Sequence, residues 1–192
     1  MKIGISKALS AQATDIIIPL FETELLAPTN NKSIDQFIKN RSKAKHFLGK
    51  THEIMQGFLD DGKKTYNIVM IGLGKKKDWT AEIGRECGGL TTKKLQALKI
   101  TTATLVTTHL GPEELLPVVE GIAIANYKVG IFKTDKKPAP LVTALTVITS
   151  APLQKKLDEI VIVANHIHHT QDLINSPADT LYPQVLAETA TK

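Results

Sequence analysis

Hydrophobic residues along this chain gather in short runs rich in Val, Ile, Leu and Thr, and longer stretches with helical periodicity lie between them. The run DIIIPL (15–20) is apolar without interruption, which is typical of a strand buried on both faces of a sheet. YNIVMIGLG (66–74) has the same character and ends in glycines. Strands are therefore predicted over residues 2–6, 15–20, 66–74, 101–108 and 141–150. Residues 53–59 fit either a strand or a short helix, and a strand is favoured.

Three segments carry the 3.6-residue periodicity of helices. The first, residues 78–98, begins at Asp78 or Thr80 with an acidic residue close behind, as is favoured at a helix N-terminus. The second, residues 111–130, opens with Gly-Pro-Glu-Glu, a strong start signal. The third begins at 151, ends near Asn175 and places these apolar side chains on one face: Leu157, Ile160, Val161, Ala164 and Ile167.

Strands that alternate with helices of this length predict an α/β domain, with a mixed, largely parallel sheet flanked by helices on both faces. We expect this compact domain to span residues 1–150 and to be followed by a linker helix over residues 151–176. Residues 177–192 then form the truncated start of a further domain. The polar segment SPADTLYP marks that boundary, and Asp179 or Thr180 is expected to begin the next unit.

Composition and charge restrict the possible classes only modestly. With 192 residues, 42% of them hydrophobic and 22% charged, the chain is typical of a globular protein with one core. Part of the net charge of +5 comes from Lys75–Lys77 and Lys136–Lys137. These runs are more typical of solvated turns than of a nucleic-acid surface, because no aromatic residues interleave them for base stacking. No apolar run approaches the ~20 residues of a membrane span and no signal peptide is present, so a cytoplasmic location is expected.

The segment IGLGKKKDW (71–79) is a candidate phosphate-binding loop, because it follows a predicted strand and precedes a predicted helix. A glycine-rich loop in that position can present backbone N–H groups to a phosphate, with Lys75–Lys77 adding positive charge. It lacks the third glycine of a dinucleotide fingerprint and the spacing of a P-loop. A tight turn that needs positive φ explains Gly72 and Gly74 equally well.

Histidines and the cysteine provide two further candidates. His166 and His169 lie one helical turn apart, but no HExxH motif accompanies them, so a solvated or interface-facing cluster with His168 is favoured over a metal site. Cys87 is the one cysteine, which excludes an internal disulfide. We expect it to be a small buried side chain at a helix end, beside a glycine pair that indicates either a break or a close helix contact.

The paired carboxylates Asp60-Asp61 and Glu113-Glu114 lie at a predicted turn and a predicted helix start, where acidic residues are favoured for structural reasons. His46, His52 and His109 are dispersed and form no pattern. From the residues alone, therefore, we assign no catalytic, cofactor-binding or metal-binding residue in this chain.

The stretch DLINSPADTLYPQVLAETA (172–190) resembles the beginning of the catalytic domain of the leucyl (cytosol) aminopeptidases. Two further segments resemble that family in the same order: VMIGLGKKKDWTAEIGRECGG (69–89) and EGIAIANYKVGIFKT (120–134), in which Ile131 and Phe132 depart slightly from the pattern. The matching residues of the first stretch are Asp172, Leu173, Asn175, Pro177, Pro183, Leu186 and Ala187.

The resemblance implies a macro-domain-like N-terminal α/β fold attached to a catalytic domain that holds two divalent metals, zinc, manganese or magnesium. In the family, Asp, Glu and Lys side chains bind these metals, and a bridging water attacks the peptide carbonyl. The family assembles as hexamers through its catalytic domains, and in some members the N-terminal domains take part in DNA binding. The family's Asn-Thr-Asp-Ala-Glu-Gly-Arg segment does not occur here, so no catalytic or metal-binding position carries over.

The sequence is therefore interpreted as the N-terminal domain and linker of a leucyl-aminopeptidase-like enzyme, present as a fragment that is inactive by itself. Its expected partners are its own catalytic domain, the other subunits of a homohexamer and the peptide substrates of the parent enzyme. Two hypotheses from other classes stay open. One is a macro-like module that binds a phosphate ligand such as ADP-ribose through Gly72–Lys77, and the other is a DNA-contacting accessory domain.

Overall fold

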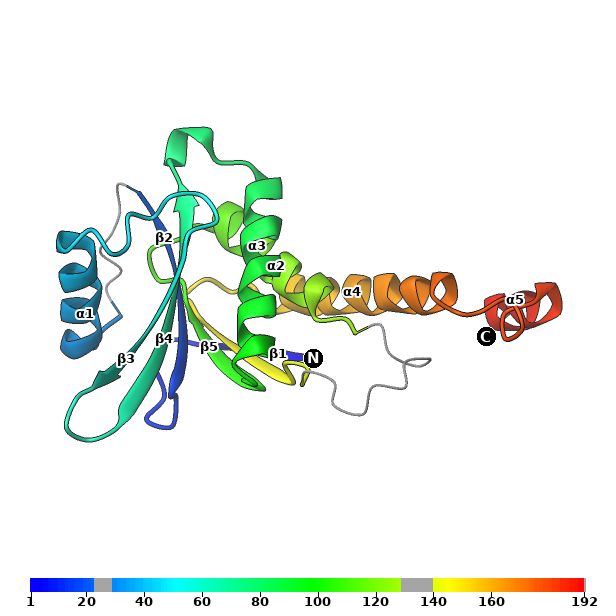
Figure 1. Ribbon diagram of the computed structural model, residues 1–192, viewed down its shortest axis with the longest axis horizontal. Coiled ribbons are helices and arrows are strands. Elements are labelled where there is room, and N and C mark those ends of the chain that lie inside the picture. The colour runs from blue at the N-terminus through cyan, green and yellow to red at the C-terminus, as the bar shows by residue number, and fades with distance from the viewer. Residues whose placement is uncertain (23–28, 129–139, 192) are drawn as a thin grey trace.

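The computed structural model describes residues 1–22, 29–128 and 140–191, which form an α/β architecture (Figure 1). Six strands of this part of the chain make one sheet in the order β1-β6-β5-β2-β4-β3, in which β3 runs antiparallel to β4 and the other pairs are parallel. The predicted mixed, largely parallel sheet is thus confirmed. The strands are β1 (Lys2–Ser6), β2 (Asp15–Phe21), β3 (Ile54–Asp60), β4 (Thr65–Gly74), β5 (Thr102–Val106) and β6 (Ala144–Ile148).

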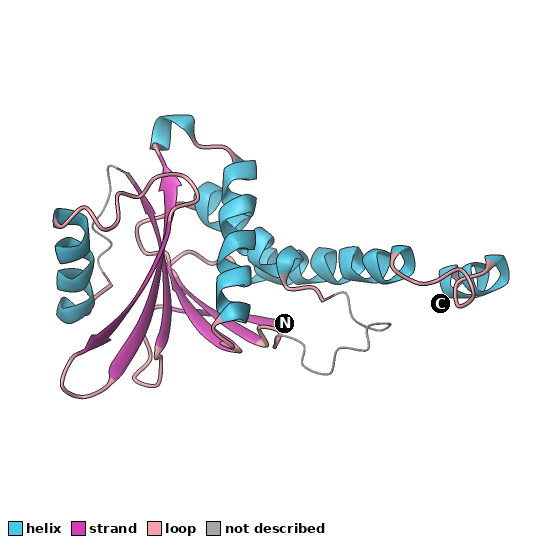
Figure 2. Ribbon diagram, in the orientation of Figure 1, coloured by secondary structure: helices cyan, strands magenta, loops and turns pink. Residues whose placement is uncertain are grey.

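Helices cover both faces of the sheet, as predicted (Figure 2). Helix α1 packs on one face through Ile34, Phe37 and Ile38, and α2, α3 and the first half of α4 pack on the other. The helices are α1 (Lys32–Lys43), α2 (Ala81–Ala97), α3 (Pro112–Ala125), α4 (Gln154–Ile174) and α5 (Pro183–Ala190), and η1 (Lys76–Asp78) is a short 3-10 turn.

The central strand β2 shows why its sequence is apolar at successive positions. Ile16 and Ile18 face the core under α1, whereas Ile17 and Phe21 face the core under α2 and α3. Because side chains alternate between the two faces of a strand, a strand between two helical layers needs apolar residues at odd and even positions alike.

Helix α1 is an element that we did not predict from the sequence. Most of its residues are polar, and the apolar ones, Ile34, Phe37 and Ile38, are few enough to be overlooked. Two signals for it are nevertheless present. These side chains follow the i, i+3, i+4 pattern of one helix face, and the Asn31 side chain accepts hydrogen bonds from the N–H groups of Ser33 and Ile34 as an N-cap.

Two predicted helix boundaries need correction. Helix α2 continues through Cys87 and the glycine pair, so Cys87 does not lie at a helix end. The helix predicted over 111–130 ends at Ala125, because the side chain of Asn126 pairs with the backbone of Val142 instead. Helix α5 begins at Pro183, after a separate turn in which the N–H groups of Thr180 and Leu181 both donate to the carbonyl of Pro177.

Helices α2 and α3 approach so closely that their contact requires glycine. A Cβ atom added to Gly88 would lie 2.1 Å from the carbonyl oxygen of Val118, and one added to Gly121 would lie 2.0 Å from that of Arg85. Thr92 reinforces the contact, since its hydroxyl donates to the carbonyl of Ile122 at 3.0 Å. Of the two alternatives for the glycine pair, a break or a close contact, the structure shows the close contact.

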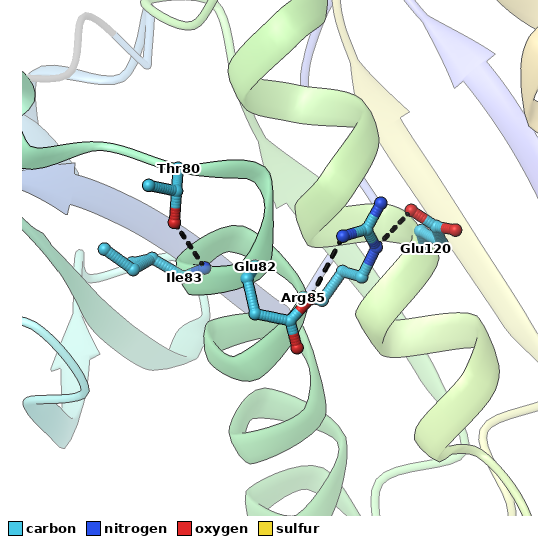
Figure 3. Close-up of polar contacts among 5 residues, drawn as sticks. All are labelled: Thr80, Glu82, Ile83, Arg85 and Glu120. Atoms are coloured by element: carbon cyan, nitrogen blue, oxygen red, sulfur yellow. Dashed lines mark hydrogen bonds and ion pairs between the residues drawn. The ribbon is translucent and has the colours of Figure 1, made fainter.

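Arg85 joins the same two helices at their exposed edge (Figure 3). Its Nε donates to Glu120 of α3 at 2.8 Å, and its Nη1 donates to Glu82, one turn earlier on α2, at 3.1 Å. The Thr80 hydroxyl accepts from the N–H of Ile83 and caps the start of α2. One guanidinium thus holds a carboxylate of each helix, which fixes how far α2 can slide along α3.

The glycine contact predicts a sharp difference between neighbouring substitutions. Gly88→Ala should lower the free energy of unfolding by about 1–3 kcal/mol or more, because the methyl group has no room. Gly89→Ala is the matched control, since its Cβ would only touch the Ala125 Cβ at 3.7 Å. We expect it to be neutral or to stabilise by up to ~1 kcal/mol through helix propensity. Urea denaturation measures both, and equal effects of the two variants would contradict the close contact.

Candidate functional site

The glycines of the candidate phosphate loop lie at the carboxyl end of β4, and their backbone groups are already used. The N–H of Gly72 donates to the carbonyl of Glu53 at 2.7 Å, and the N–H of Gly74 donates to that of Gly49 at 2.8 Å. A Cβ on Gly72 would lie 2.0 Å from the Lys50 carbonyl oxygen, and Gly74 has a φ of +78°. These glycines therefore admit the chain's own loop, residues 49–53, and leave their two amides no capacity for a phosphate.

One lysine of the run beside this loop is also engaged. The ammonium group of Lys76 lies 3.4 Å from a carboxylate oxygen of Glu114 and 5.5 Å from the centre of the Phe21 ring. Glu114 is 8% exposed, and its other carboxylate oxygen accepts from the N–H of Gly111 at 2.6 Å, which is the capping interaction that opens α3. A carboxylate at this position repels an incoming phosphate. The other predicted run, Lys136–Lys137, lies outside the described residues.

The three histidines of α4 do not converge. His166 and His169 are exposed to solvent, as predicted for a solvated cluster. His168 points toward α3, and its Nε2 lies 2.8 Å from the carbonyl oxygen of Ile124. A carbonyl oxygen can only accept, so this nitrogen carries a proton and is not a free metal ligand. Across the described ranges, no cluster of three or more His, Cys, Asp or Glu side chains could hold a metal ion.

Two of the dispersed histidines have structural partners that the sequence did not reveal. His52 Nε2 lies 2.8 Å from a carboxylate oxygen of Glu86, which ties the 49–53 loop to α2. His109 Nε2 donates to the carbonyl of Pro19 at 2.6 Å. Pro19 lies in β2 beyond Ile17, the last residue of that strand that pairs with β5. Both partners are distant in the chain, so no local pattern could have identified them.

Cys87 is buried, as predicted, and its thiol donates to the carbonyl of Gly72. Burial raises the pKa of the Cys87 thiol to about 11. Because the thiolate is the nucleophilic form, this environment suppresses reactivity at neutral pH. Asp61 shows the opposite effect at the β3–β4 turn, where hydrogen bonds from the N–H groups of Lys64 and Lys63 lower its pKa. That carboxylate organises the turn, as its sequence position indicated.

A groove of about 620 Å³ lies between α4, the end of α3 and the amino ends of β1 and β6. Val142, Val161 and Ala164 provide much of its apolar lining. The Asn126 amide donates to the carbonyl of Val142 at 2.7 Å and accepts from its N–H at 2.9 Å, so both of its polar atoms bind the backbone. Among the described residues that line the groove, Lys2 and His168 are the titratable side chains, and no Asp, Glu, Ser or Cys accompanies them. The converging acid, base and nucleophile of a catalytic pocket are therefore not assembled by these residues.

The surface that stands out is the outward side of α4 together with α5. Helix α4 leaves the sheet and carries α5 away from the domain (Figure 1), and no residue of α5 is buried. Ile174 at the end of α4 is 76% exposed, and Ile162 is 56% exposed. Further exposed apolar side chains are Val163 on α4, Leu186 on α5 and Tyr182, which directly precedes α5. Such a concentration of apolar side chains on a projecting element is typical of a contact surface.

The apolar positions of α4 do not make it a membrane span. Within the described residues, no helix combines the length and the hydropathy that crossing a bilayer requires.

Comparison with known proteins shows where similar sequences occur. A sequence profile described as the cytosol aminopeptidase family, N-terminal domain, matches residues 17–136. The probable cytosol aminopeptidases of Clostridium perfringens and Koribacter versatilis are 27% identical over 194 residues and 26% identical over 223 residues. These alignments cover 96% and 100% of this chain but 39% and 43% of the relatives, so the chain spans about two fifths of their length.

Solved structures share the fold. A mutant of tomato leucine aminopeptidase superposes with a TM-score of 0.72 at 18% identity, over 100% of this chain and 41% of that one. The bottromycin maturation enzyme BotP in complex with Mn superposes with a TM-score of 0.63 at 18% identity, over 92% of this chain and 35% of that one. At these identities the likeness concerns the arrangement of helices and strands.

The occupied amides at Gly72 and Gly74 predict that ADP-ribose does not bind. A ligand at 100 times its Kd would stabilise the folded chain by about 2.7 kcal/mol, which a thermal melt detects easily. We expect millimolar ADP-ribose to leave the melting temperature unchanged, both for the natural chain and for Lys76→Ala. A saturable rise in melting temperature that Lys76→Ala abolishes would contradict this and would restore the phosphate-binding hypothesis.

The raised pKa of Cys87 predicts that its thiol is labelled slowly in the folded chain and that the folded chain loses some stability at alkaline pH. A disulfide reagent at pH 8 should react slowly with the folded chain and rapidly after urea unfolding. Since the folded pKa is about 11 and the reference value is 9.0, the unfolded chain ionises first. The contribution of the protonated thiol to the free energy of unfolding is therefore fully present below pH 9, and it is lost as the pH rises toward 11. Cys87→Ala, the control, should lack this part of the pH dependence. Equally fast labelling of the folded chain would show that the thiol is accessible.

Proposed function

The chain belongs to the cytosol aminopeptidase family, and on that premise we propose that it is the non-catalytic N-terminal domain and linker of a dimetal exopeptidase, which removes N-terminal residues from peptides. The observation that carries the proposal is the match of residues 17–136 to the N-terminal domain of the family. The chain spans about two fifths of its curated relatives, which leaves room in those proteins for a catalytic region of larger size.

Catalysis in this proposal takes place outside the residues described above. The catalytic region would hold two divalent metals, zinc or manganese, which activate a water molecule and stabilise the charge that develops on the peptide carbonyl. One solved structure with the same fold shows the bottromycin maturation enzyme BotP in complex with Mn. The active protein would be a homohexamer. It would lie in the cytoplasm, in keeping with the name cytosol aminopeptidase that its curated relatives carry.

The partner of this chain in the proposal is its own catalytic region. We place the N-terminal domain at residues 1–150, the linker helix at 151–176 and the beginning of the catalytic domain at 177–192. The exposed side chains of Ile162, Val163 and Ile174 support this division, because apolar side chains on a linker helix gain stability when a neighbouring domain covers them.

Hydrolysis of leucine p-nitroanilide with added Mn²⁺ tests the assignment. We expect the 192-residue chain to give no turnover above the metal-only blank, because the metal ligands would lie in another region. We expect the reading frame to continue into a carboxylate-rich metal-binding region, and the complete product to hydrolyse the substrate. The Clostridium perfringens relative, assayed in parallel, shows whether substrate and metal suit the family.

Two outcomes would contradict the proposal. Metal-dependent turnover by the 192-residue chain itself would mean that it holds an active site. A complete gene product that lacks the catalytic region, or that fails on a series of amino-acid amides while the relative succeeds, would mean that the domain serves another function.

A further inference from the structure

The two halves of helix α4 are held in different ways. A helix of 21 residues is about 30 Å long, and the two buried residues of α4, Leu157 and Ala164, lie toward its beginning and its middle. The first half therefore packs on the core of the domain. Beyond Ala164 no side chain of the helix is buried, so a different interaction must hold the second half.

That interaction is a set of hydrogen bonds to Tyr127, which follows the end of α3. The Tyr127 hydroxyl donates to a carboxylate oxygen of Asp172 at 2.8 Å, and the side-chain amide of Asn175 donates to the same hydroxyl at 3.3 Å. Partial burial and the neighbouring Asp172 carboxylate both raise the pKa of Tyr127. The hydroxyl therefore keeps its proton at neutral pH and remains the donor to Asp172.

His168 adds a second attachment one turn earlier on the helix. Its Nε2 donates to the carbonyl of Ile124 at 2.8 Å, and its ring packs on the Tyr127 ring with 5.3 Å between centroids. This bond also satisfies a carbonyl in the last turn of α3, which has no partner within its own helix. Ala164, His168 and Asp172 follow at intervals of four residues, so one face of α4 changes from apolar to polar as the helix leaves the core.

Hydrogen bonds fix a direction that apolar packing alone does not. Apolar contact is non-directional and lets a helix roll or slide, whereas a hydrogen bond weakens steeply when its angle departs from linearity. Two attachments at different heights along the same face constrain both the tilt and the rotation of α4. They set the direction in which the exposed Ile162 and Ile174 point.

We propose that Tyr127, His168, Asp172 and Asn175 form a positioning latch that fixes the orientation of the second half of α4 relative to the α/β domain. The inference rests on the proposed function, because what the latch orients is the helix that would lead to the catalytic region. Asp172 and Asn175 belong to one segment that resembles the aminopeptidases, and Tyr127 belongs to another. The latch gives these residues a shared physical role, since they touch although they are far apart in the chain.

Distance measurements on the 192-residue chain test the latch. Nitroxide labels at Lys93→Cys on α2 and His169→Cys on α4 lie at exposed positions outside the latch, and Cys87 is buried. Double electron–electron resonance should give a narrow distance distribution in the parent chain. Tyr127→Phe, which keeps the ring but removes the hydroxyl, should broaden it. Amide hydrogen exchange over residues 168–174 should accelerate roughly tenfold, as expected for the loss of one or two hydrogen bonds.

Substitutions on the helix separate positioning from general damage. Asp172→Ala should broaden the distribution as Tyr127→Phe does, whereas Asp172→Asn keeps an oxygen acceptor for the hydroxyl and should restore the narrow distribution. Asp158→Ala is the matched control. It removes an α4 carboxylate that accepts from Gln154 of the same helix at 2.8 Å, and it should change nothing. Urea denaturation of each variant confirms that the domain stays folded.

Each outcome decides the proposal. Distributions and exchange rates of Tyr127→Phe and Asp172→Ala equal to those of the parent chain would overturn it, as would broadening by Asp158→Ala to the same degree. Because these measurements need neither metal nor peptide, their result is independent of the aminopeptidase assay. If the latch behaves as expected but the complete gene product lacks aminopeptidase activity, the positioning role stands and the proposed function is refuted.

Discussion

The close contact between α2 and α3 at Gly88 and Gly121 is the constraint on which the rest of the structure depends. Backbone atoms of the two helices meet there with no side chain between them, and Arg85 fixes their register at the rim. The contact sets the position of the whole of α3, including its C-terminal end. Asn126 at that end binds the backbone of Val142 just before β6, and Tyr127 binds α4. A contact between two glycines thus determines where the sixth strand enters the sheet and where the last long helix leaves it.

The features that looked most like a ligand site have structural uses. At the end of β4, close approach to Gly72 is used by the chain's own 49–53 loop, and Lys76 faces Glu114 where a phosphate would have to approach. A glycine-rich turn and a lysine run satisfy the chemistry of phosphate binding only when their N–H groups and charges are free to meet a ligand. The amides of Gly72 and Gly74 and the ammonium group of Lys76 instead hold elements of the domain itself.

Much of the fold could be predicted from the sequence, because its strands are continuous apolar runs such as Ile16–Ile18 and its helices carry start signals. Helix α1 was not predicted because its apolar face is narrow. The end of α3 was not predicted because Asn126 bonds to Val142, which is distant in the chain. The latch is beyond local pattern for the same reason, since Tyr127 and Asp172 are separated by 45 positions. The resemblance in residues 172–190 indicated a family, but no sequence pattern indicated that Asp172 and Asn175 bind Tyr127 of the domain.

A latch of hydrogen bonds suits a helix that exposes the apolar side chains of Ile162, Val163 and Ile174. If α4 were free to rotate, a neighbouring region that docks on Ile162 and Ile174 would first have to fix the orientation of the helix. The conformational entropy lost in fixing it would oppose association. Holding α4 in one orientation beforehand reduces that cost. Burying Ile162 and Ile174 against the domain would also hold the helix, but these side chains would then be unavailable to a neighbouring region. Polar attachment through His168 and Asp172 holds the helix and leaves Ile162 and Ile174 exposed, so it satisfies both requirements together.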